Sequence, residues 1–125
     1  MRKRSGTWQM VLYQEWEACD SRYTDTTYTD TFTITFNDDH SGVATGRQDT
    51  SSFSWNVRET NKQTNPSGYV IELNNLTLHA PTVTSFEIFY ILESEDNYEK
   101  WYWPGDCLFS SHKRNKYVYL TRIVD

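Results

Sequence analysis

Regular alternation of polar and apolar residues is the feature of this sequence that most restricts what the chain can fold into. In YTDTFTITF (28–36), threonine occupies every second position and the residues between are mostly apolar. Because successive side chains of a β-strand point to opposite faces, this period of two predicts a strand with one face toward a core and the other toward water. No segment shows a convincing period of 3.6 residues, so we expect an all-β fold with little or no helix.

Other segments with the same alternation, or with a short apolar run between turn residues, predict further strands. They lie at roughly 7–17, 43–48, 52–57, 69–73, 76–80, 83–93, 98–103 and 116–123. Together with the first segment they make eight or nine short antiparallel strands in a meander. A closed meander needs an even number, so we expect 76–80 or 98–103 to be irregular or merged with a neighbour. The dipeptide Asn74–Asn75 could form a turn between 69–73 and 76–80, and 104–115 is interpreted as a long loop.

Size and composition indicate one domain, with a short basic tip at 1–5 and a single β-barrel domain at 6–125. Aromatic residues make up 16 % of the chain, including nine Tyr and five Trp, so much of the core must be aromatic. The formal net charge of −5 is unfavourable for binding a nucleic-acid backbone. No apolar run approaches the ~18 residues of a membrane helix. We therefore expect neither a nucleic-acid partner nor a transmembrane segment.

Two basic clusters, MRKR at 1–4 and HKRNK at 112–116, interrupt the acidic balance, and we interpret both as solvated tips. MRKR also resembles the charged start of a signal peptide, but no apolar segment follows it. Two locations therefore stay open. The protein is expected in the periplasm or at the cell surface if a leader was removed, and in the cytoplasm otherwise.

Both ends of the barrel-forming region carry residues suited to plugging a barrel. Gly6-Thr7-Trp8 opens the first expected strand, and Thr121-Arg122-Ile123 closes the last. A barrel has no free edge, but its end needs a plug against water, which a large aromatic ring provides. An arginine lying across the indole adds a cation–π contact and can donate to nearby carbonyls. We expect Gly6, Trp8 and Arg122 to form this structural plug, whereas in an open β-sandwich Trp8 and Arg122 need not meet.

This Gly-x-Trp start and terminal arginine resemble those of the lipocalins and related calycins. In particular, FTITFNDDHSGVATG (32–46), FSWNV (53–57) and YVYLTRI (117–123) are similar to segments of the small lipocalin-like domains of Bacteroidetes cell-envelope proteins. The resemblance implies a single antiparallel up-and-down β-barrel of about eight strands that binds a small apolar or amphipathic molecule at its open end. The later T-D-Y motif and C-terminal helix of typical lipocalins are not visible, and the tyrosine of the fatty-acid-binding clamp is replaced by Val124. A fatty-acid or biotin ligand is therefore not implied.

Large aromatic residues are the best candidates for a ligand-binding site at the barrel mouth. They are Trp16, Phe53, Trp55, Tyr90, Trp101 and Trp103. An eight-stranded barrel, however, is just wide enough either to be packed solid or to hold one small ligand. A filled barrel would favour an interaction module that docks a protein or saccharide through exposed aromatics. Its contact surface is expected around Phe89 and Ile91 or at WYWPG (101–105).

The two cysteines are expected near the same rim of the barrel. Cys19 follows the first strand and Cys107 precedes the last, and these strands pair if the barrel closes. A disulfide between Cys19 and Cys107 is one interpretation, favoured if the protein is exported, and two unrelated thiols are the other.

The remaining polar clusters do not predict catalysis or metal binding. His40, His79 and His112 lack metal-ligand spacing. The cluster Asp38–His40 is typical of a hairpin tip, and the acidic residues from Glu93 to Glu99 are interpreted as a solvated turn. Neither a nucleophile elbow nor a phosphate-binding loop is present. We therefore expect a non-enzymatic protein without a metal or cofactor.

Overall fold

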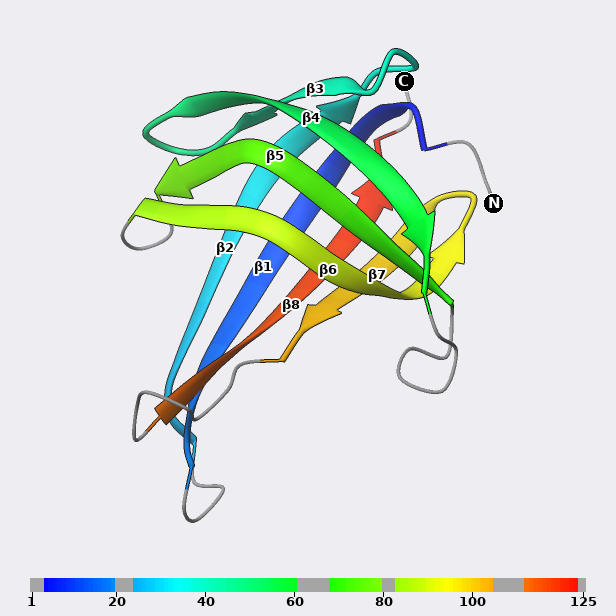
Figure 1. Cartoon of the computed structure of the whole chain (residues 1–125). Helices are drawn as coiled ribbons and strands as arrows, with labels where there is room; N and C mark the ends of the chain where they lie inside the picture. Colours follow the sequence, from blue (N-terminus) through cyan, green and yellow to red (C-terminus); the bar gives the residue numbers. More distant parts are fainter. Residues whose placement is uncertain (1–3, 20–23, 61–67, 80–82, 105–111, 124–125) are drawn as a thin grey trace.

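The computed structural model describes residues 4–19, 24–60, 68–79, 83–104 and 112–123, which form a closed antiparallel β-barrel (Figure 1). Eight strands follow one another around the barrel. They are β1 (Gly6–Ala18), β2 (Thr24–Phe36), β3 (Ser41–Thr45), β4 (Thr50–Glu59), β5 (Tyr69–His79), β6 (Val83–Glu95), β7 (Tyr98–Trp103) and β8 (His112–Arg122). The described residues contain no helix, as the absence of a 3.6-residue period predicts.

Pairing of the last strand with the first closes the sheet. β8 runs antiparallel to β1 in a register that extends from Trp8 opposite Arg122 to Ala18 opposite His112. Every other strand pairs with its neighbour in sequence. The predicted up-and-down barrel is therefore confirmed, and the open sandwich is excluded. Among the described residues, no helix has the length and apolar character needed to cross a membrane.

The strand count is eight because two expected strands are one. The segments 69–73 and 76–80 merge into β5, which continues past Asn74–Asn75 with a register shift against β6 between Glu72 and Leu76. Asn75 has a φ of 70°, which asparagine tolerates better than most residues. The predicted turn at Asn74–Asn75 is wrong: the left-handed residue makes an irregularity within one strand rather than a hairpin. β7 is a regular strand, and β8 begins at His112, inside the expected loop.

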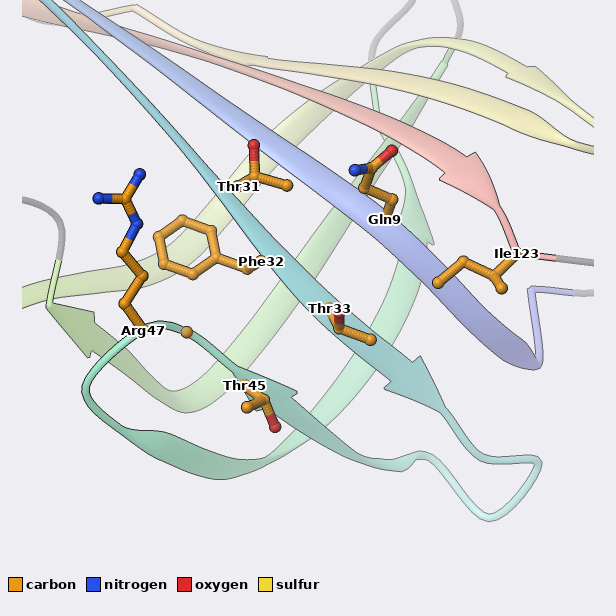
Figure 2. Close-up of a pocket in the computed structure, with 8 residues that line it drawn as sticks. Gln9, Thr31, Phe32, Thr33, Thr45, Arg47 and Ile123 are labelled. Atoms are coloured by element: carbon orange, nitrogen blue, oxygen red, sulfur yellow. The ribbon is translucent and has the colours of Figure 1, made fainter.

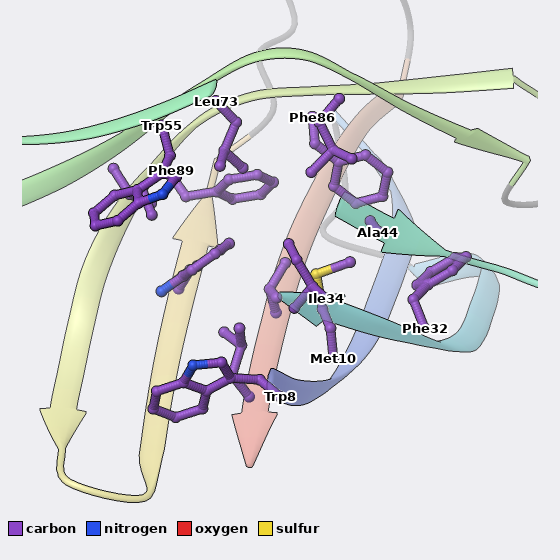
Figure 3. Close-up of a cluster of buried hydrophobic side chains, with 14 of the residues drawn as sticks. Trp8, Met10, Phe32, Ile34, Ala44, Trp55, Leu73, Phe86 and Phe89 are labelled. Carbon is purple, nitrogen blue, oxygen red and sulfur yellow. The ribbon is translucent and has the colours of Figure 1, made fainter. Parts of the chain in front are cut away.

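The inward faces of the strands form one aromatic core. Phe36 lies at its centre, with ring centroids 5.8 Å from Phe53, 5.4 Å from Trp55 and 6.3 Å from Trp101. All three contacts are edge-on, the arrangement that aromatic quadrupoles prefer. Figure 3 shows rings from β1, β2, β4 and β6 gathered in this core. Gly42 makes the packing possible, because a Cβ there would lie 2.3 Å from the Phe53 ring.

The two ends of the barrel differ in shape. We call the end where β1 begins and β8 ends the closed end, and the opposite one the far end. At the far end, β1, β2 and β8 continue beyond the other strands (Figure 1). β2 pairs with β1 along most of its length, whereas its register with β3 covers only 33–36.

Candidate functional site

Trp8 fills the closed end beneath Arg122. The indole is 1 % exposed, and the Arg122 Cζ lies 4.2 Å from its ring centroid. The Arg122 guanidinium also donates from Nε to the Asp96 carbonyl oxygen at 2.9 Å and from Nη1 to the Ser5 carbonyl oxygen at 2.7 Å. The Arg122 side chain therefore covers the indole of Trp8 and links the main chain at Ser5 to that at Asp96.

Gly6 leaves the space that Arg122 occupies. Its φ is +125°, a conformation that residues with a Cβ rarely adopt. A Cβ at this position would also lie 2.6 Å from Arg122 Nη1. Backbone conformation and side-chain packing thus both require glycine here.

A second arginine at the closed end is buried in an ion pair. Arg4 Nη2 lies 2.7 Å from each carboxylate oxygen of Glu99, and Arg4 Nε donates to Glu99 Oε1 at 3.2 Å. Both side chains are 3 % exposed. The predictions that Arg4 belongs to a solvated basic tip and Glu99 to a solvated acidic turn are therefore wrong. Glu99 lies on β7 on the same face as Trp101, and that face points into the core.

Tryptophans complete the surroundings of this ion pair. Trp101 donates from Nε1 to Glu99 Oε1 at 2.9 Å, and Ser94 donates to Glu99 Oε2 at 3.3 Å. The Arg4 Cζ lies 5.7 Å from the centroid of Trp55, within the range of a cation–π contact. Trp8 Nε1 donates to the Arg4 carbonyl oxygen at 2.9 Å. Sequence reasoning missed this site, although the parity of Glu99 and Trp101 in YEKWYW could have placed the carboxylate inside.

The aromatic residues expected to line a mouth are not gathered at one place. Phe53, Trp55 and Trp101 are buried together in the core around Phe36. Trp16 lies eight positions beyond Trp8 on β1, toward the far end. Tyr90 and Trp103 instead pair with each other, with ring centroids 6.1 Å apart.

The predicted outer surface around Phe89 and Ile91 is wrong. Both residues are 1 % exposed and belong to the core, where Phe89 lies opposite Ile71 and Ile91 opposite Trp101. The alternation of β6 therefore turns Tyr90 outward.

The outer wall carries a continuous row of aromatic side chains, which we call the aromatic band. Its members are Tyr13 on β1, Tyr117 on β8, Tyr102 on β7 and Tyr90 on β6. Tyr117 lies 6.1 Å from Tyr13 and 4.8 Å from Tyr102, measured between ring centroids. Tyr102 lies opposite Tyr90 in the sheet register, and Tyr90 contacts Trp103. Burial and the nearby Tyr102 raise the pKa of Tyr117 to about 12.

A small pocket lies at Trp103, whose ring contacts Tyr90 of the aromatic band. Its volume is about 90 Å³, and Ile88 and Phe89 line it together with Trp103, Glu87 and Lys116. This volume is far below the ~300–1,000 Å³ typical of small-molecule sites. The pocket can take one apolar side chain between a carboxylate and an ammonium group.

A larger groove of about 500 Å³ runs over the outer wall of β1, β2 and β3 (Figure 2). Figure 2 shows Arg47 and the ring of Phe32 toward one side of the groove and Ile123 toward the other. The hydroxyl groups of Thr31, Thr33 and Thr45 lie along it. The groove is amphipathic, but it lies outside the barrel rather than at its open end.

A third polar cluster surrounds Asp30 on β2. Tyr28 donates to Asp30 Oδ2 at 2.7 Å, and the Thr31 backbone N–H donates to Oδ1 at 2.8 Å. Arg47 Nε lies 3.4 Å from Oδ1. Desolvation and the hydrogen bond to Asp30 raise the pKa of Tyr28 to about 12.

The structure places only part of the expected cysteine and metal sites. Cys19 follows β1 and is disulfide-bonded. Cys107 lies outside the described residues, so its pairing with Cys19 stays a prediction. Within the described ranges, no three side chains of His, Cys, Asp or Glu come together as a metal site would require. His40 instead stacks on Trp55, with ring centroids 4.6 Å apart and planes 7° from parallel.

Comparison with known proteins adds no relative from which a function could be carried over. No protein-family model, curated protein or solved structure matches the chain.

Proposed function

We propose that this domain is a non-enzymatic, lipocalin-like interaction module that docks a partner protein on the outer wall of a filled barrel. The observation that carries the proposal is the aromatic band, which extends over four adjacent strands from Tyr13 to Tyr90. Tyr and Trp are enriched where proteins bind each other, because they bury much area at a low cost in side-chain entropy.

The packing of the interior supports an outer rather than an inner site. Trp8, Trp101 and Phe36, which occupy the middle and the closed end, are at most 1 % exposed. When such rings fill the interior of an eight-stranded barrel, little room is left inside for a ligand, and the outer surface is the better candidate for recognition.

The small pocket beside Trp103 supports a protein as the partner. Protein interfaces concentrate their binding energy in a few side chains that fill pockets of this kind. Glu87 and Lys116 lie at the pocket, and Lys100 Nζ lies 5.5 Å from the ring centroid of Tyr119 on the same wall. An aromatic centre with charges of both signs around it matches the usual anatomy of a protein interface.

Site-specific photocrosslinking tests this proposal directly. A benzophenone amino acid replaces Tyr102 in the aromatic band or, as the matched control, Thr33 on the wall of β2, and the protein is irradiated in its own cells. We expect one discrete protein adduct from position 102, lost when Trp103→Ala is added, and none from position 33. Equal adducts from both positions would contradict the proposal. So would the absence of a protein adduct together with retardation of the domain in polysaccharide gels, which would indicate a saccharide partner.

Binding of a small amphipathic molecule is a second candidate, favoured by the groove of about 500 Å³. Its volume lies within the usual range for small-molecule sites, and it combines Phe32 and Ile123 with the hydroxyl groups and Arg47. Native mass spectrometry of the unreduced protein, purified gently, tests this candidate. A co-purifying molecule that is lost in Arg47→Ala would support it, and one retained in that variant would place the ligand elsewhere.

A further inference from the structure

Glu99 has the surroundings of a ligand-binding carboxylate rather than those of a stray surface charge. It is 2 % exposed and accepts hydrogen bonds from Trp101 and Ser94 on its own hairpin. Those two donors are neutral, so the negative charge itself is balanced only by the guanidinium of Arg4 among the contacts described. A carboxylate this deeply buried is stable only with a cation against it.

The geometry around Glu99 selects a guanidinium group. Arg4 meets both carboxylate oxygens through Nη2 and adds a third contact from a second nitrogen, Nε, which a single ammonium does not have. The ring of Trp55 lies 5.7 Å from the Arg4 Cζ and offers its π-system to the delocalised charge.

Arg4, which occupies this site, is not part of a paired strand of the barrel. β1 begins at Gly6, whose partner is Phe36, so Arg4 precedes the first paired residue. The main chain around it is held by bonds that do not involve its side chain. Trp8 donates to the Arg4 carbonyl oxygen, and Arg122 donates to that of Ser5. The guanidinium of Arg4 can therefore be removed without removing a strand pairing.

We propose that Glu99, Trp101 and Trp55 form a guanidinium-binding site that the chain fills with its own Arg4, and that takes an alkylguanidinium ligand when Arg4 is withdrawn. The site lies inside the closed end and is independent of the aromatic band on the outer wall. Arg4 is then an internal competitor, and the affinity of the site for an outside ligand depends on whether this side chain is in place.

Chemical rescue of Arg4→Ala with methylguanidinium tests the proposal. Titration is followed by tryptophan fluorescence, because Trp55 and Trp101 lie at the site, and by the urea midpoint. We expect a saturable signal and recovery of at least part of the lost midpoint. Methylammonium should bind about tenfold or more weakly, because it lacks the second nitrogen that donates from the position of Nε and the planar group that faces the Trp55 ring.

Two controls separate binding from a general solvent effect. The double variant Arg4→Ala, Glu99→Gln has a neutral site and should show no saturable response. The unmodified protein should also show none, because Arg4 occupies the site. A response of the double variant equal to that of Arg4→Ala would overturn the proposal.

Loss of folding in Arg4→Ala would not obscure the result. In that case the variant is refolded with increasing methylguanidinium, and recovery of the β-sheet circular dichroism becomes the readout. Failure of methylguanidinium to restore folding at any concentration below its denaturing range, or to give a saturable fluorescence change in a folded variant, overturns the proposal.

Discussion

Among the described residues, two carboxylates are buried on inward faces of the barrel, Glu99 at the closed end and Asp30 on the part of β2 nearer the far end, and they are balanced in different ways. Glu99 pairs with an arginine as buried as itself, each side chain 3 % exposed. Asp30 is 7 % exposed, but its cation, Arg47, is 81 % exposed and 3.4 Å away. Water can replace the exposed Arg47, whereas Arg4 is almost completely shielded from it. The two acids are similarly buried, but because their cations differ in exposure, Glu99 should depend on its partner far more than Asp30 does.

The largest effect should come from breaking the buried pair. Arg4→Ala leaves the Glu99 charge in the core without its cation, and we expect a loss of about 3–5 kcal/mol of unfolding free energy. Urea denaturation followed by tryptophan fluorescence measures it. A loss below about 1 kcal/mol would mean that water reaches Glu99 and that the two carboxylates are alike.

Next in size are changes at Arg122, the second cation of the closed end, which donates to the carbonyl oxygens of Asp96 and Ser5. Arg122→Ala should cost about 1–3 kcal/mol through its lost hydrogen bonds and indole contact. Gly6→Ala should cost about as much, since strain at its φ of +125° adds to the clash with Arg122.

A double-mutant cycle sharpens this point. Because removal of Arg122 also removes the clash, Gly6→Ala should cost less in the Arg122→Ala background than alone. Additive losses in urea denaturation would show that Gly6 serves its own backbone and not the guanidinium.

Removing the exposed cation should have a small effect. Arg47→Ala should change the unfolding free energy by less than about 1 kcal/mol, because an exposed partner contributes little and the Tyr28 and Thr31 bonds to Asp30 remain. The comparison fails if this variant is as unstable as Arg4→Ala in the same urea assay.

The smallest expected effect is on how stability depends on pH, through Tyr28, which donates to Asp30. The Tyr28 pKa is raised to about 12, largely by desolvation and by its bond to Asp30, whereas an unfolded tyrosine titrates near 10. The folded chain keeps this proton where the unfolded chain has lost it. The stabilisation is thus complete below pH ~10 and is lost as pH rises toward ~12. Tyr28→Phe should make the alkaline fall in the urea midpoint shallower, and tyrosinate absorbance of the two proteins should differ by one late-titrating group.

The sequence predicts the barrel better than it predicts the closed end. Alternation and the residues at the two termini of the barrel region were enough for the fold, because each inward face is set by local parity. The same parity puts Arg122 on the inward face of the last strand, opposite Trp8. The Arg4–Glu99 pair joins residues 95 positions apart, and Arg4 precedes the first strand, so no period applies to it. The prediction of a turn at Asn74–Asn75 failed for another reason. A left-handed asparagine fits either a hairpin or a bulge, and the pairing with the neighbouring strands determines which of the two forms.

Closure of the ring also bears on how the chain folds. Seven of the eight strand pairings join neighbours in sequence and can form as local hairpins, whereas β1 and β8 must find each other across almost the whole chain. Bringing together such distant segments is the slow step expected for a β-topology. Trp8, Arg122 and Ser5 lie at this seam, and the contact between Ser5 and Arg122 spans 117 positions. The residues that cover the end of the barrel therefore also hold together the one strand pairing that we expect to form last.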